Sequence, residues 1–396
     1  MTARRRAAYS DRTVSPSETL VRTAPFLADF GITRIARHTG LDNIGIPVWC
    51  AYVPNGRSVA IAQGKGLTDD DAKASAVMEA LERVVANRPA IPTFRTSAHD
   101  LRAAGFAFDT LACLIGRHES DIRLDEPVDW ALGKDLLTDR EIYVPLDAAL
   151  LDRTRRNRFW MSSDGLASGN TPQEAILHGV LERIERDAYC LWQIASEADR
   201  FARCIDPVSF DDPLVDKLVS KIETAGLAMR LFDMTSDIAV PCVTAVVGPS
   251  KRRDGNIRFV EVTGGSGAHP SPVRAAVRAM TEAVQSRITY ISGARDDLSQ
   301  DVFQRPAPAE TVRALDAMPV VCSTIAASQR HGVGPHLDEV FNALREREIA
   351  PVIALPLTDG ALPFHVVKVF IPGLENPEGA RARRFGARAI AKAVFS

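Results

Sequence analysis

The sequence lacks a surplus of charge of either sign. Its 396 residues include 48 Lys and Arg against 50 Asp and Glu, which gives a formal net charge of −2. Bulk electrostatic attraction to nucleic acid or to an anionic membrane requires a positive field that this chain does not have. We therefore expect neither nucleic acid nor a membrane surface among its partners.

Cysteine motifs and long hydrophobic runs are also missing. The six cysteines are scattered, without a CxxC pair or a Cys and His spacing that would build a zinc site. We expect reduced, mostly buried thiols. The longest apolar stretch, around residues 238–247, is far shorter than the ~20 residues of a membrane span, and the basic N-terminus has no apolar segment behind it. The expected location is the cytoplasm.

The common nucleotide-binding motifs are absent as well. The chain contains neither GxxxxGK followed by Ser or Thr nor a GxGxxG of the dinucleotide type, and Gly64-Lys65-Gly66 matches neither pattern. The backbone amides or Lys65 of this short segment could contact phosphate, but a tight turn is the simpler interpretation. Any bound nucleotide must therefore use a different scaffold.

The composition is that of a globular protein, with 46% hydrophobic and 25% charged residues. β-branched stretches that alternate with helical periodicity indicate an α+β fold. Residues 1–25 are expected to be a flexible arm and residues 26–396 one domain, with a possible subdivision near residues 190–230. Beyond short strands in residues 31–54, the expected strands cover residues 59–62, 142–145, 229–233, 239–247, 257–262, 353–356 and 365–371. Residues 88–135 and 296–350 carry no motif and are expected to be peripheral.

Two segments about a hundred residues apart align without gaps. They are GLTDDDAKASAVMEALER, residues 66–83, and GNTPQEAILHGVLERIER, residues 169–186. Thr68 with an acid three residues later, and Thr171 likewise, have the form of a capping box at a helix start. A third segment begins with Ser271 and a proline and keeps the same offsets. The repeat predicts three equivalent helices packed on β-sheet.

Each predicted helix carries polar groups three residues apart, eleven residues or more after its cap. The three pairs are Glu79 with Glu82, Glu182 with Glu185, and Glu282 with Gln285. A spacing of three places both groups on one helix face. One such pair alone would be read as a solvated surface pair, but the repetition in register and the apolar neighbours indicate that part of this face is buried.

Converging carboxylates need a cation between them. Two carboxylates about 4 Å apart repel by roughly 4 kcal/mol at an effective dielectric constant of about 20. Oxygen ligands without imidazole or thiolate favour Mg²⁺, which brings phosphate oxygens with it. The expected metal ligands are Glu79, Glu82, Glu182 and Glu185. The residues therefore predict a magnesium–nucleotide site built from helices.

Five segments, in this order, resemble the YcaO family over about residues 31–388. They are GITRIARHTGLDNIGIPVWCAYVP, GKGLTDDDAKASAVMEALER, SSDGLASGNTPQEAILHGVLERIERDAYCLW, EAVQSRITYISGARDDL and VVKVFIPGLE. The chain is most similar to stand-alone members that work with a TfuA-type partner. The resemblance implies a YcaO-type fold, an ATP-binding catalytic domain over residues 26–396, and an enzyme that uses ATP and Mg²⁺ to activate backbone amides. A sulfur or oxygen nucleophile adds to the amide, the oxygen is phosphorylated, and loss of phosphate leaves a thioamide or an azoline.

The resemblance also assigns site residues, position by position. The implied ATP contacts are Ser75, Glu79, Glu82, Arg83, His178, Glu182, Glu185, Arg186, Gln285 and Arg287. Two positions depart from the family pattern: Thr289 replaces an arginine found in some members, and His178 replaces a common asparagine. His178 is either a variant of the ligand shell or a packed core histidine. Arg34 is a candidate for an N-terminal nucleotide contact.

The segments that are missing at the chain end favour one product. No terminal PxPxP follows RFGARAIAKAVFS, and no fused peptide-binding domain is present, so we expect a peptide or protein substrate, a separate partner and a thioamide product. An azoline-forming cyclodehydratase is the alternative. A non-catalytic scaffold and a general ATP-dependent ligase are two further alternatives. A homodimer is expected from the resemblance alone.

Overall fold

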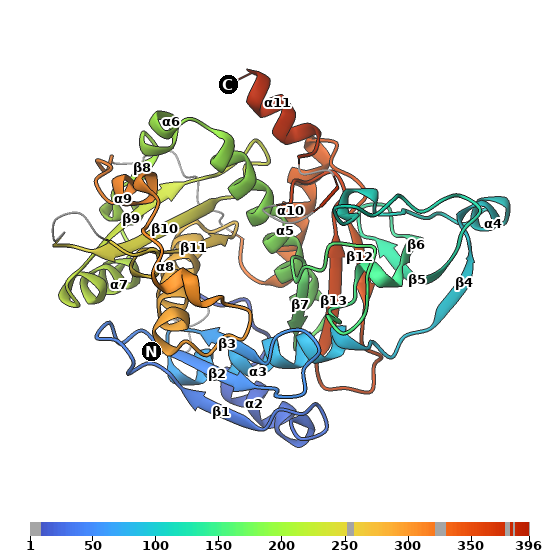
Figure 1. Cartoon of the computed structure of the whole chain (residues 1–396), viewed down its shortest axis with the longest axis horizontal. Helices are drawn as coiled ribbons and strands as arrows, with labels where there is room; N and C mark the ends of the chain where they lie inside the picture. The colour runs from blue at the N-terminus through green and yellow to red at the C-terminus, as the bar shows by residue number, and fades with distance from the viewer. Residues whose placement is uncertain (1–8, 252–256, 321–329, 377–380, 383–384, 396) are drawn as a thin grey trace.

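Three antiparallel sheets build the protein, whose computed structural model describes residues 9–251, 257–320, 330–376, 381–382 and 385–395 (Figure 1). The first sheet contains β1 (Arg34–Arg37), β2 (Val48–Tyr52) and β3 (Ile61–Lys65). The second has the order β11 (Thr263–Ala268), β10 (Cys242–Pro249), β9 (Leu227–Asp233) and β8 (Cys204–Ile205). The third has the order β4 (Thr93–Ser97), β5 (Pro127–Asp135), β12 (Ile353–Pro356), β13 (His365–Phe370) and β7 (Leu166–Gly169), and β6 (Arg140–Pro145) pairs with β5.

Three long helices lie between these sheets (Figure 1). They are α3 (Asp69–Asn87), α5 (Pro172–Ile194) and α8 (Pro272–Ser292). The other α-helices are α2 (Pro16–Thr23), α4 (Ala98–Ala103), α6 (Glu197–Phe201), α7 (Pro213–Thr224), α9 (Ala309–Ala314), α10 (Val333–Glu346) and α11 (Ala387–Phe395). Short 3-10 helices cover Ala24–Phe26, Ala112–Leu114, Leu146–Ala148, Pro207–Phe210, Phe259–Glu261 and Gln300–Phe303.

The three long helices belong to a repeated strand–helix unit. β3, β7 and β11 each end a few residues before α3, α5 and α8, and each helix packs on the strand that precedes it. Glycine permits this close packing, because a Cβ atom on Gly64 would lie 2.1 Å from the carbonyl oxygen of Ala72, and one on Gly265 would lie 2.2 Å from the backbone nitrogen of Ala283. The three expected helices are thus present.

The repeated units close into a ring. α3 also contacts β7, α5 contacts β11, and α8 contacts β3, so each helix touches the strand of the next unit and the last returns to the first. Helix faces that are about a hundred residues apart in the sequence therefore meet at the centre of the molecule. This arrangement turns the repeated carboxylate pairs into one site.

The starts of the three helices differ in detail. The Thr68 hydroxyl accepts from the Asp71 backbone nitrogen while the Asp71 carboxylate accepts from that of Thr68, so both halves of a capping box are present. Thr171 accepts from the Glu174 nitrogen, but the Glu174 carboxylate is bonded to the Asn170 nitrogen instead. Ser271 makes no side-chain cap.

Most of the expected strands are present with shifted bounds, but two expectations were wrong. Residues 257–262 contain the 3-10 helix Phe259–Glu261 rather than a strand. Residues 88–135 are not peripheral, because β5 pairs with β4, β6 and β12 and its Trp130 is fully buried. The exposed positions of β5 include Leu132, and the polar Asp135 is buried, so the sequence of this strand does not show the period-2 polarity of a half-buried strand. In residues 296–350, α10 packs on α5 through Leu337, Val340 and Leu344.

The expected flexible arm also differs from the structure. Residues 16–23 form α2, which packs on α3, and the Ser15 hydroxyl caps it by accepting from the Glu18 nitrogen. The Thr19 hydroxyl donates to the Asn170 side chain over 3.0 Å. Ser15 followed by proline is itself a helix-start signal that the basic composition of the arm concealed. The single domain over residues 26–396, with a subdivision near residues 190–230, stays a prediction.

The described residues also bear on the expectations about membrane spans and cysteines. Within the described ranges, every helix is too short or too polar to cross a bilayer. Cys50, Cys190, Cys204 and Cys242 are buried free thiols, and Cys113 is a half-buried one. Cys322 lies outside the described residues.

Candidate functional site

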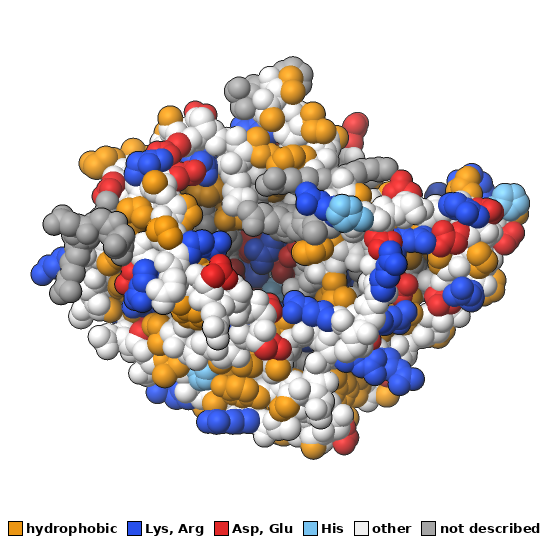
Figure 2. All heavy atoms as spheres, in the orientation of Figure 1, with side chains coloured by type: hydrophobic (Ala, Val, Ile, Leu, Met, Phe, Trp, Pro, Cys, Tyr) orange, Lys and Arg blue, Asp and Glu red, His pale blue; other side chains and the backbone are white. Residues whose placement is uncertain are grey.

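A cavity of about 730 Å³ lies where the three long helices meet. Figure 2 shows the molecule hollowed near the centre of this face, with basic and acidic side chains in the depression. Nine of the ten predicted nucleotide contacts line it, namely Ser75, Glu79, Glu82, Arg83, His178, Glu182, Glu185, Arg186 and Gln285. The predicted metal ligands Glu79, Glu82, Glu182 and Glu185 are all among them. The closed ring of units brings these residues together from three separate helices.

Several of these carboxylates are buried and repel one another. Burial raises the pKa of Glu82 well above its ordinary value, and the charges of Glu79 and Glu182 raise it further. Burial raises the pKa of Glu182 to about 7, even though Arg186 favours its charged form. The pKa of Glu185 is raised by burial too, with Glu282 acting in the same direction. The basic side chains present therefore leave part of the negative charge uncompensated.

Basic side chains do pair with some members of the cavity. Arg83 lies 2.9 Å from Glu79, and Lys65 donates to Glu282 over 2.6 Å. Burial acts to raise the pKa of Glu282, but Lys65 and Arg186 together lower it below its ordinary value. Lys65 thus reaches the cavity rather than only forming a turn.

Arg186 is held loosely by three acidic groups. Its guanidinium lies 3.6 Å from Glu182, 3.5 Å from Glu185 and 3.4 Å from Asp164, and its buried Nε makes no hydrogen bond to any residue that the structure describes. Such distances are longer than those of a bidentate pair. The positive charge of Arg186 therefore reduces the repulsion among these carboxylates without forming short hydrogen bonds to them.

The donor chemistry of the cavity fits a hard cation together with a polyphosphate. Glu82, Glu182 and Glu185 offer oxygen ligands, and burial together with acidic neighbours raises the pKa of each. Mg²⁺ prefers such ligands and keeps coordination positions for phosphate oxygens. Arg278 and Arg295 line the same cavity and supply donors for a phosphate chain. The residues present thus fit a magnesium–nucleotide complex.

His178 lines the cavity beside these groups. Burial lowers its pKa well below the ordinary value, and the positive charges of Arg278 and Arg12 lower it further. The imidazole is therefore neutral at physiological pH. Of the two interpretations left open by the sequence, this position favours the ligand shell over a packed core histidine.

Arg287 is the predicted contact that the structure does not bring into the cavity. Its Nε lies 3.8 Å from an Asp42 carboxylate oxygen, on a different helix face from Gln285. Two residues along an α-helix turn by about 200°, so positions 285 and 287 cannot share a face. Arg34, the candidate N-terminal nucleotide contact, stacks 5.7 Å from the ring centre of Tyr52 and is not among the described residues that line the cavity.

Sequence reasoning missed part of the basic lining. Arg274 and Arg278 line the cavity from α8, on the same face as Glu282. The three residues are spaced by four, which is the signal that could have identified the two arginines. Arginine is frequent throughout this chain, and that abundance conceals the spacing.

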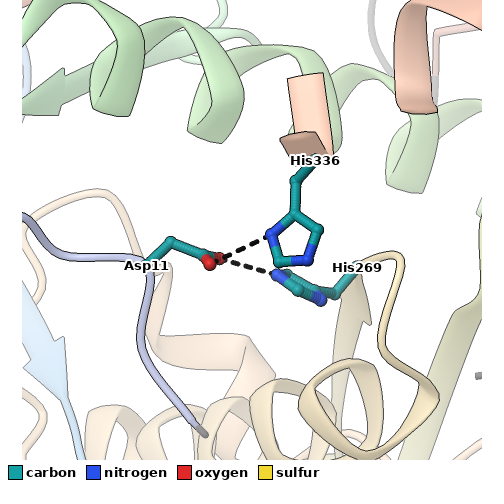
Figure 3. A group of neighbouring side chains, drawn as sticks. All are labelled: Asp11, His269 and His336. Carbon is teal, nitrogen blue, oxygen red and sulfur yellow. Dashed lines mark hydrogen bonds and ion pairs between the residues drawn. The ribbon is translucent and has the colours of Figure 1, made fainter. Parts of the chain in front are cut away.

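A second cluster joins the N-terminal arm to the edge of the same cavity (Figure 3). Asp11 from the arm meets His269, which precedes α8, and His336 from α10. The Asp11 carboxylate lies 2.7 Å from His269 Nε2, 3.0 Å from His336 Nδ1 and 2.5 Å from the Arg274 guanidinium. Burial acts to raise the pKa of Asp11, but its bonds to the two histidines lower it far below the ordinary value.

Two histidines and a carboxylate could bind a metal ion, or they could form a hydrogen-bonded cluster without one. The hydrogen bonds of His269 decide between these two possibilities. His269 Nδ1 accepts from the Ser271 backbone N–H over 2.8 Å, so the ring proton is on Nε2, which donates to Asp11. A protonated nitrogen has no lone pair for a metal. The Arg274 guanidinium already supplies a positive charge to the same carboxylate. The cluster is therefore an ionic latch that fastens the arm at the cavity edge.

The comparisons with known proteins agree with this geometry. The sequence model of the family described as "YcaO cyclodehydratase, ATP-ad Mg2+-binding" matches residues 63–375. A Rhizobium leguminosarum bv. trifolii protein described as "Uncharacterized protein in tfuA 3'region" is 39% identical, over 96% of this chain and 93% of that one. An uncharacterized protein of Methanothermobacter thermautotrophicus is 35% identical, over 91% of this chain and 94% of that one.

Solved structures show the same fold at low sequence identity. "The structure of YcaO from Methanopyrus kandleri bound with AMPPCP and Mg2+" superposes with a TM-score of 0.70 at 22% identity, over 92% of both chains. A "Heterocyclase in complex with substrate and Cofactor" superposes with a TM-score of 0.74 at 20% identity, over 93% of this chain and 54% of that one. These likenesses establish the fold that the repeated helices build.

Proposed function

The chain belongs to the YcaO family of ATP-dependent, Mg²⁺-binding, cyclodehydratase-like enzymes, and from that premise we propose that it converts a backbone amide of a peptide or protein into a thioamide. A TfuA-type protein is the proposed partner, and a homodimer the proposed assembly. The central cavity is the proposed site of the chemistry.

The uncompensated charge of the buried carboxylates carries this proposal. Without a cation, the repulsion among Glu82, Glu182 and Glu185 only lowers the stability of the fold. A non-catalytic scaffold has no use for that arrangement, which makes the scaffold the weaker alternative. Glu79, Glu82, Glu182 and Glu185 would hold Mg²⁺, whose charge would offset that repulsion. Lys65, Arg278 and Arg295 would then contact the phosphates from the cavity wall.

The chemistry explains why ATP is needed. An amide oxygen is a poor leaving group, and MgATP, when bound, supplies the phosphoryl group with which that oxygen can leave. Overall, one amide, one hydrosulfide and one ATP give one thioamide, one ADP and one phosphate. A carbon–sulfur bond forms and the carbon–oxygen bond breaks, while the amide oxygen and the hydrosulfide proton leave in the phosphate. The basic side chains orient the phosphates and stabilise the charge on the transferred group.

A specific observation supports the thioamide product and the TfuA-type partner. The Rhizobium relative is described by its place in the tfuA 3' region, and the two chains match over nearly their full lengths. The azoline-forming cyclodehydratase is the alternative, since a structural neighbour is described as a heterocyclase. Both products require the same activation of the amide oxygen, so the cavity serves either reaction.

Calorimetric titration of MgATP is the first test of the proposed site. We expect the wild-type protein to bind, and the Glu82→Gln and Glu185→Gln variants to bind at least roughly tenfold more weakly. The matched control is Glu223→Gln, which changes an exposed glutamate on α7 and should leave the affinity unchanged. Equal affinity in all four proteins would contradict the assignment of the carboxylates.

Mass spectrometry of candidate peptides then distinguishes the products. Incubation with MgATP, hydrosulfide and the partner should exchange one oxygen for sulfur. Loss of water without sulfur uptake would identify the azoline-forming reaction instead. ATP binding without any peptide product under either condition would count against amide activation.

A further inference from the structure

A second, smaller cavity lies beside the carboxylate site. Its volume is about 20 Å³, and its polar lining includes Ser162, Asp164, Arg183, Lys368 and Arg381. Ser162 and Asp164 line this cavity, whereas Ser163 between them lines the large one. A single turn of chain thus separates the two cavities.

Positive charge dominates the lining of the small cavity. Arg183, Lys368 and Arg381 are each at most 4% exposed, and Asp164 is the single acidic side chain in the described lining. Asp164 is also shared with Arg186 at 3.4 Å. Burial lowers the pKa of Lys368 to about 8 although nearby Asp164 and Glu182 oppose this. The cavity therefore has an excess of buried positive charge.

One buried donor in this lining has no acceptor in the described part of the chain. Arg183 Nη2 donates to the Glu375 carbonyl over 2.9 Å, but its buried Nη1 makes no hydrogen bond. Lys368 Nζ donates to the Ser162 carbonyl over 2.6 Å, which uses one of its three hydrogens. A buried donor without an acceptor is costly, and a bound anion would satisfy it.

Size and wall chemistry restrict what can bind. A volume of about 20 Å³ holds one small ion or one water, and a phosphate chain does not fit. Leu111, Leu114, Trp160 and Phe370 form apolar walls. Such walls penalise strongly hydrated anions, because the lost hydration is replaced by few polar contacts. A weakly hydrated monovalent anion fits this combination.

We propose that the small cavity binds one monovalent anion between Arg183 and Lys368, and that in the working enzyme this anion is hydrosulfide. The identity of the anion rests on the proposed function, since thioamide formation consumes hydrosulfide. The carboxylate cavity by itself repels an anion, whereas the small cavity attracts it. Ser163 and Glu182 line the carboxylate cavity, and their chain neighbours Ser162, Asp164 and Arg183 line the small one, so the held anion lies next to the site where it is needed.

Binding of defined anions to the full chain tests the proposal. Sodium hydrosulfide and sodium chloride are titrated at equal ionic strength, at a pH above the first pKa of hydrogen sulfide, and thermal stabilisation reports the affinity. We expect hydrosulfide to bind the wild-type protein more tightly than chloride. Arg183→Gln and Lys368→Met should each weaken hydrosulfide binding at least about tenfold. The matched control is Lys134→Met, an exposed lysine on β5 paired with Asp139, which should change nothing.

A second measurement uses the wild-type protein and does not depend on the folding of a variant. Crystals soaked in bromide should show one anomalous peak between the Arg183 and Lys368 side chains. No peak together with no hydrosulfide stabilisation would overturn the site. Chloride as effective as hydrosulfide would overturn the assignment of the anion. Titration of MgATP into the wild type and into the same variants separates this proposal from the proposed function. A wild type that binds the anion but not MgATP would contradict only the proposed function, whereas variants that keep both MgATP and the anion would contradict only the anion site.

Discussion

The carboxylates at the centre of the cavity and the Asp11 carboxylate at its edge are all buried or half-buried acids, yet their pKa values shift in opposite directions. The pKa of Glu182 is raised to about 7 by burial, whereas that of Asp11 lies far below its ordinary value. The difference is in the partners: Asp11 receives bonds from two histidines and an arginine, while the central glutamates face one another. Burial by itself therefore does not identify a binding site. A buried acid identifies a candidate binding site when the protein supplies no positive charge to compensate it.

Removal of Asp11 should produce the largest effect on stability. Asp11→Ala leaves Arg274 and His336 buried without their carboxylate, and we expect the free energy of unfolding to fall by about 3 kcal/mol. Urea denaturation measures this change. The control is Asp129→Ala, an exposed carboxylate 3.3 Å from Arg95, which should cost less than about 1 kcal/mol. Equal losses in the two variants would contradict the latch.

Glu182→Gln should change the free energy of unfolding in the opposite direction and stabilise the metal-free protein at neutral pH. Because the pKa of Glu182 is raised from 4.5 to about 7 in the folded protein, its contribution to stability is present below pH 4.5 and is lost as the pH rises through 7. Relative to Glu182→Gln, the metal-free wild type should lose up to about 3 kcal/mol over that range. Denaturation in a chelating buffer at several pH values measures the difference. Saturating MgATP should abolish it, and a pH-independent difference would be inconsistent with our account.

Low pH should weaken the cluster that Asp11 forms with His269 and His336. The same change protonates the glutamates of the central cavity and so reduces their repulsion. Burial lowers the pKa of His269 from 6.5 to about 4, so its stabilising contribution is present above pH 6.5 and is lost as the pH falls through 4. The added proton would occupy Nδ1, which accepts from the Ser271 N–H. We expect proteolytic cleavage within residues 9–13 to accelerate on the order of tenfold over this range. In His269→Asn the cleavage rate should depend on pH much less; an equally steep dependence would assign the opening to another group.

Arg287→Gln should have the smallest effect on nucleotide binding. Its side chain lies at Asp42 and outside the cavity lining, so the calorimetric affinity for MgATP should change by less than about twofold. Arg186→Gln is the contrasting variant, because Arg186 lines the cavity and should weaken binding at least about tenfold. Similar losses in both variants would restore Arg287 to the site.

Residues that share a helix face are the part of the site that the sequence predicts. The repeated spacing is enough to place Glu79 with Glu82 and Glu182 with Glu185, because helix geometry is local. The same geometry excludes Arg287, two positions after Gln285, whereas a match to a family motif does not distinguish helix faces. The anion cavity and the latch have no sequence signal, since their members come from segments far apart in the chain.

The three helices, their polar faces and the choice of oxygen ligands can be predicted from the sequence alone, because periodicity and side-chain chemistry are properties of short segments. Which faces meet, which carboxylates keep a partner and which remain uncompensated can be seen only in the folded protein. Those outcomes depend on the ring in which each helix packs on the strand of the next unit. Electrostatic interactions depend on distance in space, and distance between remote segments exists only once the chain has folded.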